Sequence, residues 1–140
     1  MRNKGQVALE YLLIFTISLI ILLIFTLPLT QQSIENTLDI SNTLNTKSDL
    51  SKIAQTIKQV HGEGQGSKQK INIQSDKNIE LTIANNYIST NLNLTGTNKQ
   101  IKINYKSNLD KTNIQLSKGE NILTVEWPIN NEKMIIYKNQ

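Results

Sequence analysis

An uninterrupted apolar run near the N-terminus constrains this chain more than any other feature. Residues 11–29 read YLLIFTISLIILLIFTLPL and contain no charged side chain. A helix rises ~1.5 Å per residue, so about 20 apolar residues are needed to cross ~30 Å of hydrocarbon. With residues 7–9 added, the run is long enough, and we predict a membrane helix.

The charges around this run predict its orientation. Arg2 and Lys4 precede it, whereas residues 30–46 contain no Lys or Arg. The positive-inside rule therefore predicts a cytoplasmic N-terminus and an external C-terminal part. Glu10 stands at the edge of the run with no basic residue one helical turn away. An ionisable group there is costly, so we interpret it as functional; the alternative is a carboxylate solvated at headgroup depth.

The segment does not have the pattern of a cleaved secretory signal. Such a signal has an Ala-x-Ala-like site after its apolar core. Here the residues after Leu29 are TQQS, and the small residue Gly5 precedes the core instead. Cleavage, if it occurs, is therefore expected on the N-terminal side of the helix.

The residues KGQVALEYL at positions 4–12 resemble the leader of archaeal type IV pilins with class III signal peptides. In that family a membrane prepilin peptidase cuts after the glycine, and the apolar helix stays on the mature subunit. The resemblance implies cleavage between Gly5 and Gln6. It also assigns Lys4 and Glu10 to processing and assembly.

The resemblance covers about the first 29 residues and departs from the family pattern at one position. Ala8 stands where the pattern prefers serine. The pair Glu10-Tyr11 is also similar to the Glu-Tyr pair of bacterial Flp-type pilins. The archaeal class III branch and the Flp-like branch therefore both stay open.

The resemblance implies a structural subunit of an archaeal type IV pilus, an adhesive surface filament whose subunits wait in the cytoplasmic membrane before assembly. The implied partners are other pilin subunits, the prepilin peptidase, and the assembly platform with its ATPase. In the filament, the new ammonium of Gln6 would meet the Glu10 carboxylate of a neighbour, because an unpaired buried charge is costly. The alternative is a non-polymerising single-pass membrane protein with an external β-domain that acts as a binding or pilus-assembly accessory module.

A long helix is expected to continue beyond the apolar run. Pro28 removes a helix hydrogen bond and predicts a kink, with Thr26 placed to satisfy part of the freed carbonyl region. Residues 31–60 contain no Gly or Pro, and they end in an apolar stripe at helical spacing. The members of the stripe are Leu50, Ile53, Ile57 and Val60. We predict one helix over 6–60, with a membrane or filament-core part at 7–29, an amphipathic part at 31–60, and room for a bend or break near 41–48.

The glycine-rich stretch HGEGQGS predicts the end of this helix and a flexible linker over residues 61–69. A phosphate loop would precede a helix, whereas these glycines follow one. His61 is the only histidine, and we expect it to be a solvated linker residue.

From residue 70 the apolar pattern changes to a period of two. Short alternating runs separated by Asn-, Ser- and Gly-containing clusters predict an antiparallel β-sheet or sandwich over 70–140. We read residues 118–121, KGEN, as a hairpin turn, and residues 134–137 as a last strand that is buried on both faces or against the helix. The predicted fold class is α+β, with a long N-terminal hydrophobic helix followed by a small β-rich head domain.

Composition argues against several other functions. The chain has no cysteine, and the carboxylates of the head are scattered, so we expect no enzyme activity, no metal site and no cofactor. The net charge is +4, of which Arg2 and Lys4 supply two, and the remaining Lys residues form no block; we expect no nucleic-acid binding. Asn93 begins the only Asn-x-Ser/Thr sequence and is a candidate N-glycosylation site.

Overall fold

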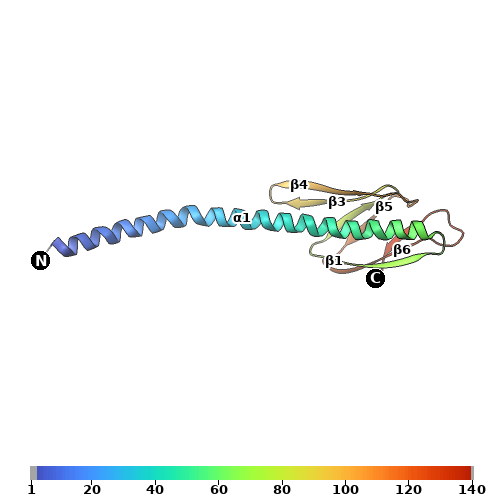
Figure 1. Ribbon diagram of the computed structural model, residues 1–140, viewed down its shortest axis with the longest axis horizontal. Helices are drawn as coiled ribbons and strands as arrows, with labels where there is room; N and C mark the ends of the chain where they lie inside the picture. Colours follow the sequence, from blue (N-terminus) through green and yellow to red (C-terminus); the bar gives the residue numbers. More distant parts are fainter. Residues whose placement is uncertain (1–2, 140) are drawn as a thin grey trace. The chain divides into compact units, whose positions relative to one another are not determined.

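The structure is a computed structural model that describes residues 3–139, with side chains from Gly5 onward. It contains one long helix, α1 (Asn3–Glu63), and seven strands (Figure 1). Its internal contacts divide the chain into two compact units, Met1–Leu38 and Asp39–Gln140. The first unit is the N-terminal part of α1 alone, and the second contains the rest of α1 and every strand.

In the first unit, α1 is stabilised locally, because its side chains have no core to enter. Every large apolar residue from Val7 to Leu38 is exposed. Pro28 lies inside the helix, and its missing N–H leaves the carbonyl of Ile24 without its usual donor. Thr26 does not compensate as expected, because its hydroxyl donates to the Leu22 carbonyl instead, at 2.7 Å.

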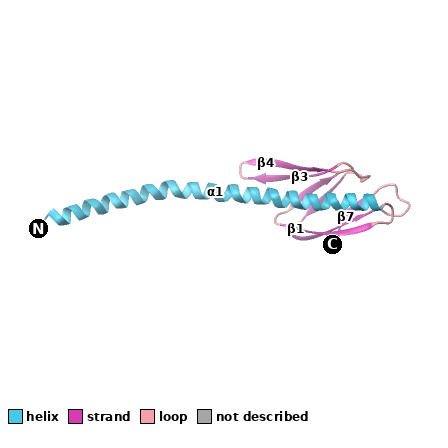
Figure 2. Cartoon of the chain, in the orientation of Figure 1, coloured by secondary structure: helices cyan, strands magenta, loops and turns pink. Residues whose placement is uncertain are grey.

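The strands of the second unit form two antiparallel sheets (Figure 2). One has the order β1-β6-β7 and the other the order β4-β3-β2-β5. Their bounds are β1 (Lys68–Ser75), β2 (Ile79–Ile83), β3 (Tyr87–Leu94), β4 (Thr97–Asn104), β5 (Thr112–Leu116), β6 (Gly119–Glu126) and β7 (Ile135–Lys138). A long apolar helix followed by antiparallel sheets confirms the predicted α+β class.

The core of the second unit lies between the helix and the strands. The helical stripe is completely buried, with exposures of 1% for Leu50 and 0% for Ile53, Ile57 and Val60. It clusters with inward-facing strand residues of both sheets, such as Ile73. Figure 1 shows this part of α1 running along the strands. The stripe therefore packs against the chain's own head, and α1 passes through residues 41–48 without interruption.

One strand prediction is wrong. Residues 118–121 do not form a hairpin turn, because β5 and β6 belong to different sheets and the chain crosses between them here. The Asn121 amide stabilises this crossing by accepting from the Ser117 N–H at 2.9 Å and donating to the Ser117 carbonyl at 2.7 Å. In β7 only one face is buried: Ile136 is 8% exposed, whereas its neighbours Ile135 and Tyr137 are 41% and 38% exposed.

The helix ends in a cap that connects it firmly to β1. Gly64 has φ +87° and donates its N–H to the Val60 carbonyl at 3.1 Å, which is the αL capping arrangement. The connection to β1 is only residues 64–67. His61 is not a free linker residue, because it lies in the last helical turn and stacks on Trp127, with ring centroids 5.6 Å apart.

Candidate functional site

The candidate site is the N-terminal part of α1, where the sequence places processing and assembly. Gly5 and Gln6 lie in α1 and are exposed. A Cβ built on Gly5 would meet no atom within 4 Å, so the structure places no internal obstacle beside the predicted cleavage point. Lys4 is helical, but its side chain lies outside the described part of the chain, as does all of Arg2.

Glu10 is an exposed carboxylate on an otherwise apolar helix surface. None of the ion pairs among the residues with described side chains involves it. Its flanking residues Leu9 and Tyr11 are 66% and 69% exposed. A carboxylate in such a setting is stable in water or beside a cation, and it is costly in hydrocarbon alone.

The surrounding helix has the length and composition of a membrane span. Its most apolar 18-residue window has a mean hydropathy of 2.8 and contains no buried residue. The threonines in the apolar run do not interrupt this surface, because their hydroxyls bond back to the helix. Thr16 donates to the Leu12 carbonyl at 2.8 Å, and Thr30 donates to the Leu27 carbonyl at 2.8 Å. With these hydroxyls bonded to its own backbone, the apolar run can be stable in lipid or in contact with other apolar helices.

Asn93, the candidate glycosylation residue, is exposed near the end of β3, where it pairs with Asn98 of β4. The turn that follows is held to α1, because the Thr95 N–H donates to the Asp39 carboxylate at 2.9 Å. The Asn93 amide thus projects from a hairpin whose tip is fixed in place.

The structure also brings together charged groups of the head that the sequence does not associate. Lys68 and Glu126 form a 2.8 Å ion pair across β1 and β6, and the Tyr137 hydroxyl donates to the same carboxylate at 3.2 Å. The hydrogen bond from Lys68 is the main cause that lowers the pKa of Glu126, and its counterpart raises the pKa of Lys68. The pair lies at the end of the β1–β6 pairing, and Tyr137 links it to β7.

A second association missed in the sequence lies between α1 and the turn that joins β1 to β2. It contains Thr46 and Asp49 of the helix and Asp76 of the turn. Spacing could not reveal it, because Asp76 lies far along the chain from the helical residues. Across the residues that the structure describes, no three His, Cys, Asp or Glu side chains are grouped to hold a metal ion.

Comparison with known proteins gives a match on the N-terminal segment. Residues 3–29 match the family model described as Class III signal peptide. Neither a curated protein nor a solved structure matches the chain. The match includes Gly5, Gln6, Glu10 and Pro28, so the sequence resemblance and the family model agree on the same stretch. Residues 3–29 of this chain are therefore similar to class III signal peptides and match a type IV pilin-like prepilin leader.

Proposed function

We propose that this protein is a structural subunit of an archaeal type IV pilus. The observation that carries the proposal is the signal-peptide match over residues 3–29 on a helix whose large apolar side chains are all exposed up to Leu38. A helix with such a surface must be covered by lipid or by protein. A filament subunit uses both environments in turn, first in the membrane and then among neighbouring helices.

Processing is the first step of the proposed function. A prepilin peptidase on the cytoplasmic side cuts the bond between Gly5 and Gln6, and the basic residue Lys4 leaves with the leader. Residues 1–5 are thus a cleaved leader, and Gln6 acquires a new terminal ammonium. The exposed position of Gly5, with open space around a built Cβ, is compatible with access by an enzyme.

Assembly then provides the partner that Glu10 lacks within its own chain. The Gln6 ammonium of one subunit meets the Glu10 carboxylate of another as the helices leave lipid and pack into the filament core. An unpaired charge in such a core is strongly unfavourable, so the pair favours the axial register in which it forms. Pro28, inside the same helix, is the position at which the axis bends.

The second unit forms the outer part of the filament in this proposal. The strands, from residue 68 onward, form the external head, which the glycine-containing connection at 64–67 joins to the helix. The head carries contacts between subunits and contacts with surfaces to which the cell adheres. Exposed Asn93 is a candidate carrier of an N-linked glycan on the outer face. The assembly platform and its ATPase are the remaining partners.

The alternative function is a single-pass membrane protein that does not polymerise and presents its β-domain as a binding or pilus-assembly accessory module. The fate of the leader distinguishes it from the pilin, since a plain anchor retains residues 1–5. The decisive experiment determines the N-terminal residue of the protein from its own cells by intact mass and terminal peptide sequencing. We expect the mature chain to begin at Gln6, whereas a retained Met1 or Arg2 contradicts the proposal.

Two variants extend this experiment to filament formation. Gly5→Val is expected to insert into the membrane but to remain unprocessed and to form no filaments. Glu10→Ala is expected to be inserted and cleaved normally and to assemble poorly, as measured by sheared filaments relative to membrane-bound subunit. Normal assembly of Glu10→Ala would contradict the charge-pairing mechanism while leaving the processing result intact. Absence of this chain from purified filaments would contradict its role as a filament subunit.

A further inference from the structure

The loop between β6 and β7 carries the most exposed of the large apolar side chains that the structure describes. Ile129 is 74% exposed, a larger fraction than any side chain of the apolar run in α1. Single exposed apolar residues are common on protein surfaces. Ile129 differs from most of them because it belongs to a loop that is fixed in place.

Hydrogen bonds hold this loop beside the C-terminal end of α1. The Gly66 N–H donates to the Trp127 carbonyl at 2.7 Å, and the Trp127 N–H donates to the Ser67 carbonyl at 2.9 Å. The Trp127 indole N–H donates to the Asn131 carbonyl at 2.8 Å. Ile129 lies against Gly66, since a Cβ built on that glycine would be 3.4 Å from its Cγ1. A side chain fixed in this way loses little conformational freedom when a partner covers it.

An apolar hollow of about 300 Å³ lies beside an earlier part of α1, within the second unit. Ile40 and Leu44 of the helix and Leu94 of β3 supply its apolar walls. Ile40 and Leu44 are 61% and 60% exposed, so the hollow is open to a partner. An apolar cavity of about 150 Å³ holds a benzene molecule, so this hollow accommodates an isoleucine side chain.

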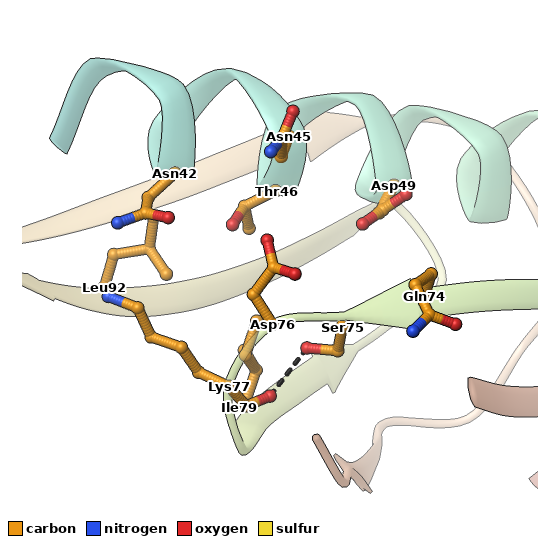
Figure 3. Close-up of a pocket in the computed structure, with 10 residues that line it drawn as sticks. All are labelled: Asn42, Asn45, Thr46, Asp49, Gln74, Ser75, Asp76, Lys77, Ile79 and Leu92. Carbon is orange, nitrogen blue, oxygen red and sulfur yellow. Dashed lines mark hydrogen bonds between the residues drawn. The ribbon is translucent and has the colours of Figure 1, made fainter. Parts of the chain in front are cut away.

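Another hollow beside the same part of α1 does not suit an apolar side chain (Figure 3). It has a volume of about 20 Å³, and its walls include Asn45 and Asp49 of the helix and Asp76 of the turn between β1 and β2. Figure 3 shows Asp76 extending from this turn towards the helix. Of the two hollows, the apolar one therefore fits Ile129.

Ile129 and the apolar hollow lie at opposite ends of the second unit. α1 rises ~1.5 Å per residue, so its segment from Leu44 to Glu63 is about 28 Å long. Figure 1 shows the β3–β4 hairpin extending along α1 away from the C-terminal end of the helix, beside which Ile129 lies. A chain therefore cannot place its own Ile129 in its own hollow, whereas a second copy can.

The charges near the two surfaces are complementary. Lys99 lines the hollow, and Glu132 belongs to the same loop as Ile129. Neither takes part in an ion pair among the described side chains, whereas Lys133 of that loop is paired with an aspartate. Asp39, the other charged residue of the hollow, accepts a hydrogen bond from a backbone N–H at 2.9 Å. The hollow thus offers an unpaired cation and the loop an unpaired carboxylate, which favours their association.

We propose that Ile129 of one copy inserts into the apolar hollow of a second copy, with Glu132 directed to Lys99. Because the two surfaces differ, the contact is heterologous and adds copies in one direction, which gives an open row unless it closes into a ring. The inference rests on the proposed filament function, which brings many copies together. It adds a contact between second units to the packing of the apolar helices.

Disulfide trapping in intact cells tests this contact, because the chain has no native cysteine. A disulfide requires the two Cβ atoms to approach to ~3.5–4.5 Å. Leu44→Cys/Ile129→Cys is expected to give dimers, trimers and longer species on a non-reducing gel, because each copy carries both surfaces. Each single variant should stay monomeric, and cells that produce both single variants should form dimers only. Both positions are exposed, so the substitutions leave the core intact.

Asp76→Cys/Ile129→Cys is the matched control, because Asp76 is exposed and lies at the polar hollow beside the same part of α1. This pair should give no ladder of cross-linked species. A further variant, Ile129→Asp, needs no cysteine. It should reduce the yield of sheared filaments severalfold and leave cleavage of the leader unchanged, because a carboxylate is costly in an apolar hollow.

The proposal is overturned if Leu44→Cys/Ile129→Cys stays monomeric, if the control pair forms the same ladder, or if Ile129→Asp leaves the filament yield unchanged. Dimers of Ile129→Cys alone would also overturn it, because two loops would then meet each other. Terminal sequencing of the same samples separates this inference from the proposed function. A chain that begins at Gln6 without cross-links overturns the contact alone, whereas a cross-linked chain that retains Met1 overturns the proposed function and leaves the contact standing.

Discussion

Tyr105 illustrates how a single polar group is accommodated in the core of the second unit. The side chain is 7% exposed, and its hydroxyl donates to the Ala84 carbonyl at 2.7 Å. Burial raises the pKa of this phenol, because the charged phenolate is poorly solvated there. The neutral phenol is thus required by the folded state, whereas the unfolded chain ionises at ordinary tyrosine pH.

Because the pKa of Tyr105 is higher in the folded chain than in the unfolded chain, we predict that the protein loses stability at alkaline pH. Above about pH 10 the unfolded chain binds fewer protons than the folded chain, so the free energy of unfolding falls as pH rises. Tyr105→Phe should lower that free energy by about 1 kcal/mol at pH 7, because the Ala84 carbonyl loses its donor. The variant should then lose less stability than the parent protein between pH 9 and about pH 11. Urea unfolding at each pH measures both effects.

Tyr87→Phe is the matched control for this measurement. The Tyr87 hydroxyl makes no hydrogen bond among the described residues, and its ring lies 4.2 Å from the Lys102 ammonium, a contact that phenylalanine keeps. We expect the free energy of unfolding of Tyr87→Phe to be close to that of the parent protein at neutral and at alkaline pH. Parallel alkaline losses in Tyr105→Phe and the parent protein would show that Tyr105 is not the group responsible.

At the scale of the element, the C-terminus of α1 is determined by one left-handed residue. Gly64 adopts φ +87°, and no atom lies within 4 Å of a Cβ built there. Gly62, two residues earlier, is helical and equally open. The two glycines thus have similar space around them and differ in backbone conformation.

Alanine at Gly62 and alanine at Gly64 are expected to change the free energy of unfolding in opposite directions. Gly64→Ala should lower the free energy of unfolding by about 1 to 2 kcal/mol, because an L-residue is strained in the left-handed region. Gly62→Ala should raise it by about 0.5 to 1 kcal/mol, because alanine restricts the unfolded chain and favours helix. Urea denaturation of both variants under one condition provides the measurement. Changes of the same sign would contradict the assignment of Gly64 as the cap.

At the scale of the whole molecule, the two units differ in where their apolar surface goes. In the unit Met1–Leu38 the large apolar side chains are exposed, whereas the unit Asp39–Gln140 encloses a continuous core. The helix supplies part of this core through Leu50, Ile53 and Ile57. The exposed N-terminal part of α1 is therefore expected to limit solubility in water, whereas the part from Asp39 onward is expected to be needed for folding.

Two truncations examine this expectation. A fragment of residues 39–140 should be soluble without detergent and should unfold cooperatively, because it retains every residue of the buried cluster. A fragment of residues 64–140 lacks the helical side of that cluster and should aggregate, since the inner faces of both sheets would meet water. Size-exclusion chromatography and thermal circular dichroism distinguish the outcomes. A 39–140 fragment without a cooperative transition would contradict the division into two units.

Local sequence patterns were sufficient to predict the elements of this protein. Helix and strand follow from the spacing of apolar residues, and the stripe at Leu50, Ile53, Ile57 and Val60 is buried as its period predicts. The N-terminal leader is also a local signal, which the family match over residues 3–29 supports. These features depend on neighbours in the chain, so the printed sequence contains them directly.

Only the tertiary structure decided which elements meet. Every strand shows a similar alternation of apolar and polar residues, so the sequence does not indicate which strands pair. The crossing between sheets near residues 118–121 and the burial of only one face of β7 therefore depend on three-dimensional packing. The same holds for the stacking of His61 on Trp127. The cavity at Thr46, Asp49 and Asp76 exists because the β1–β2 turn folds back onto α1. Such long-range contacts arise from the burial of the whole apolar surface at once, which no local spacing records.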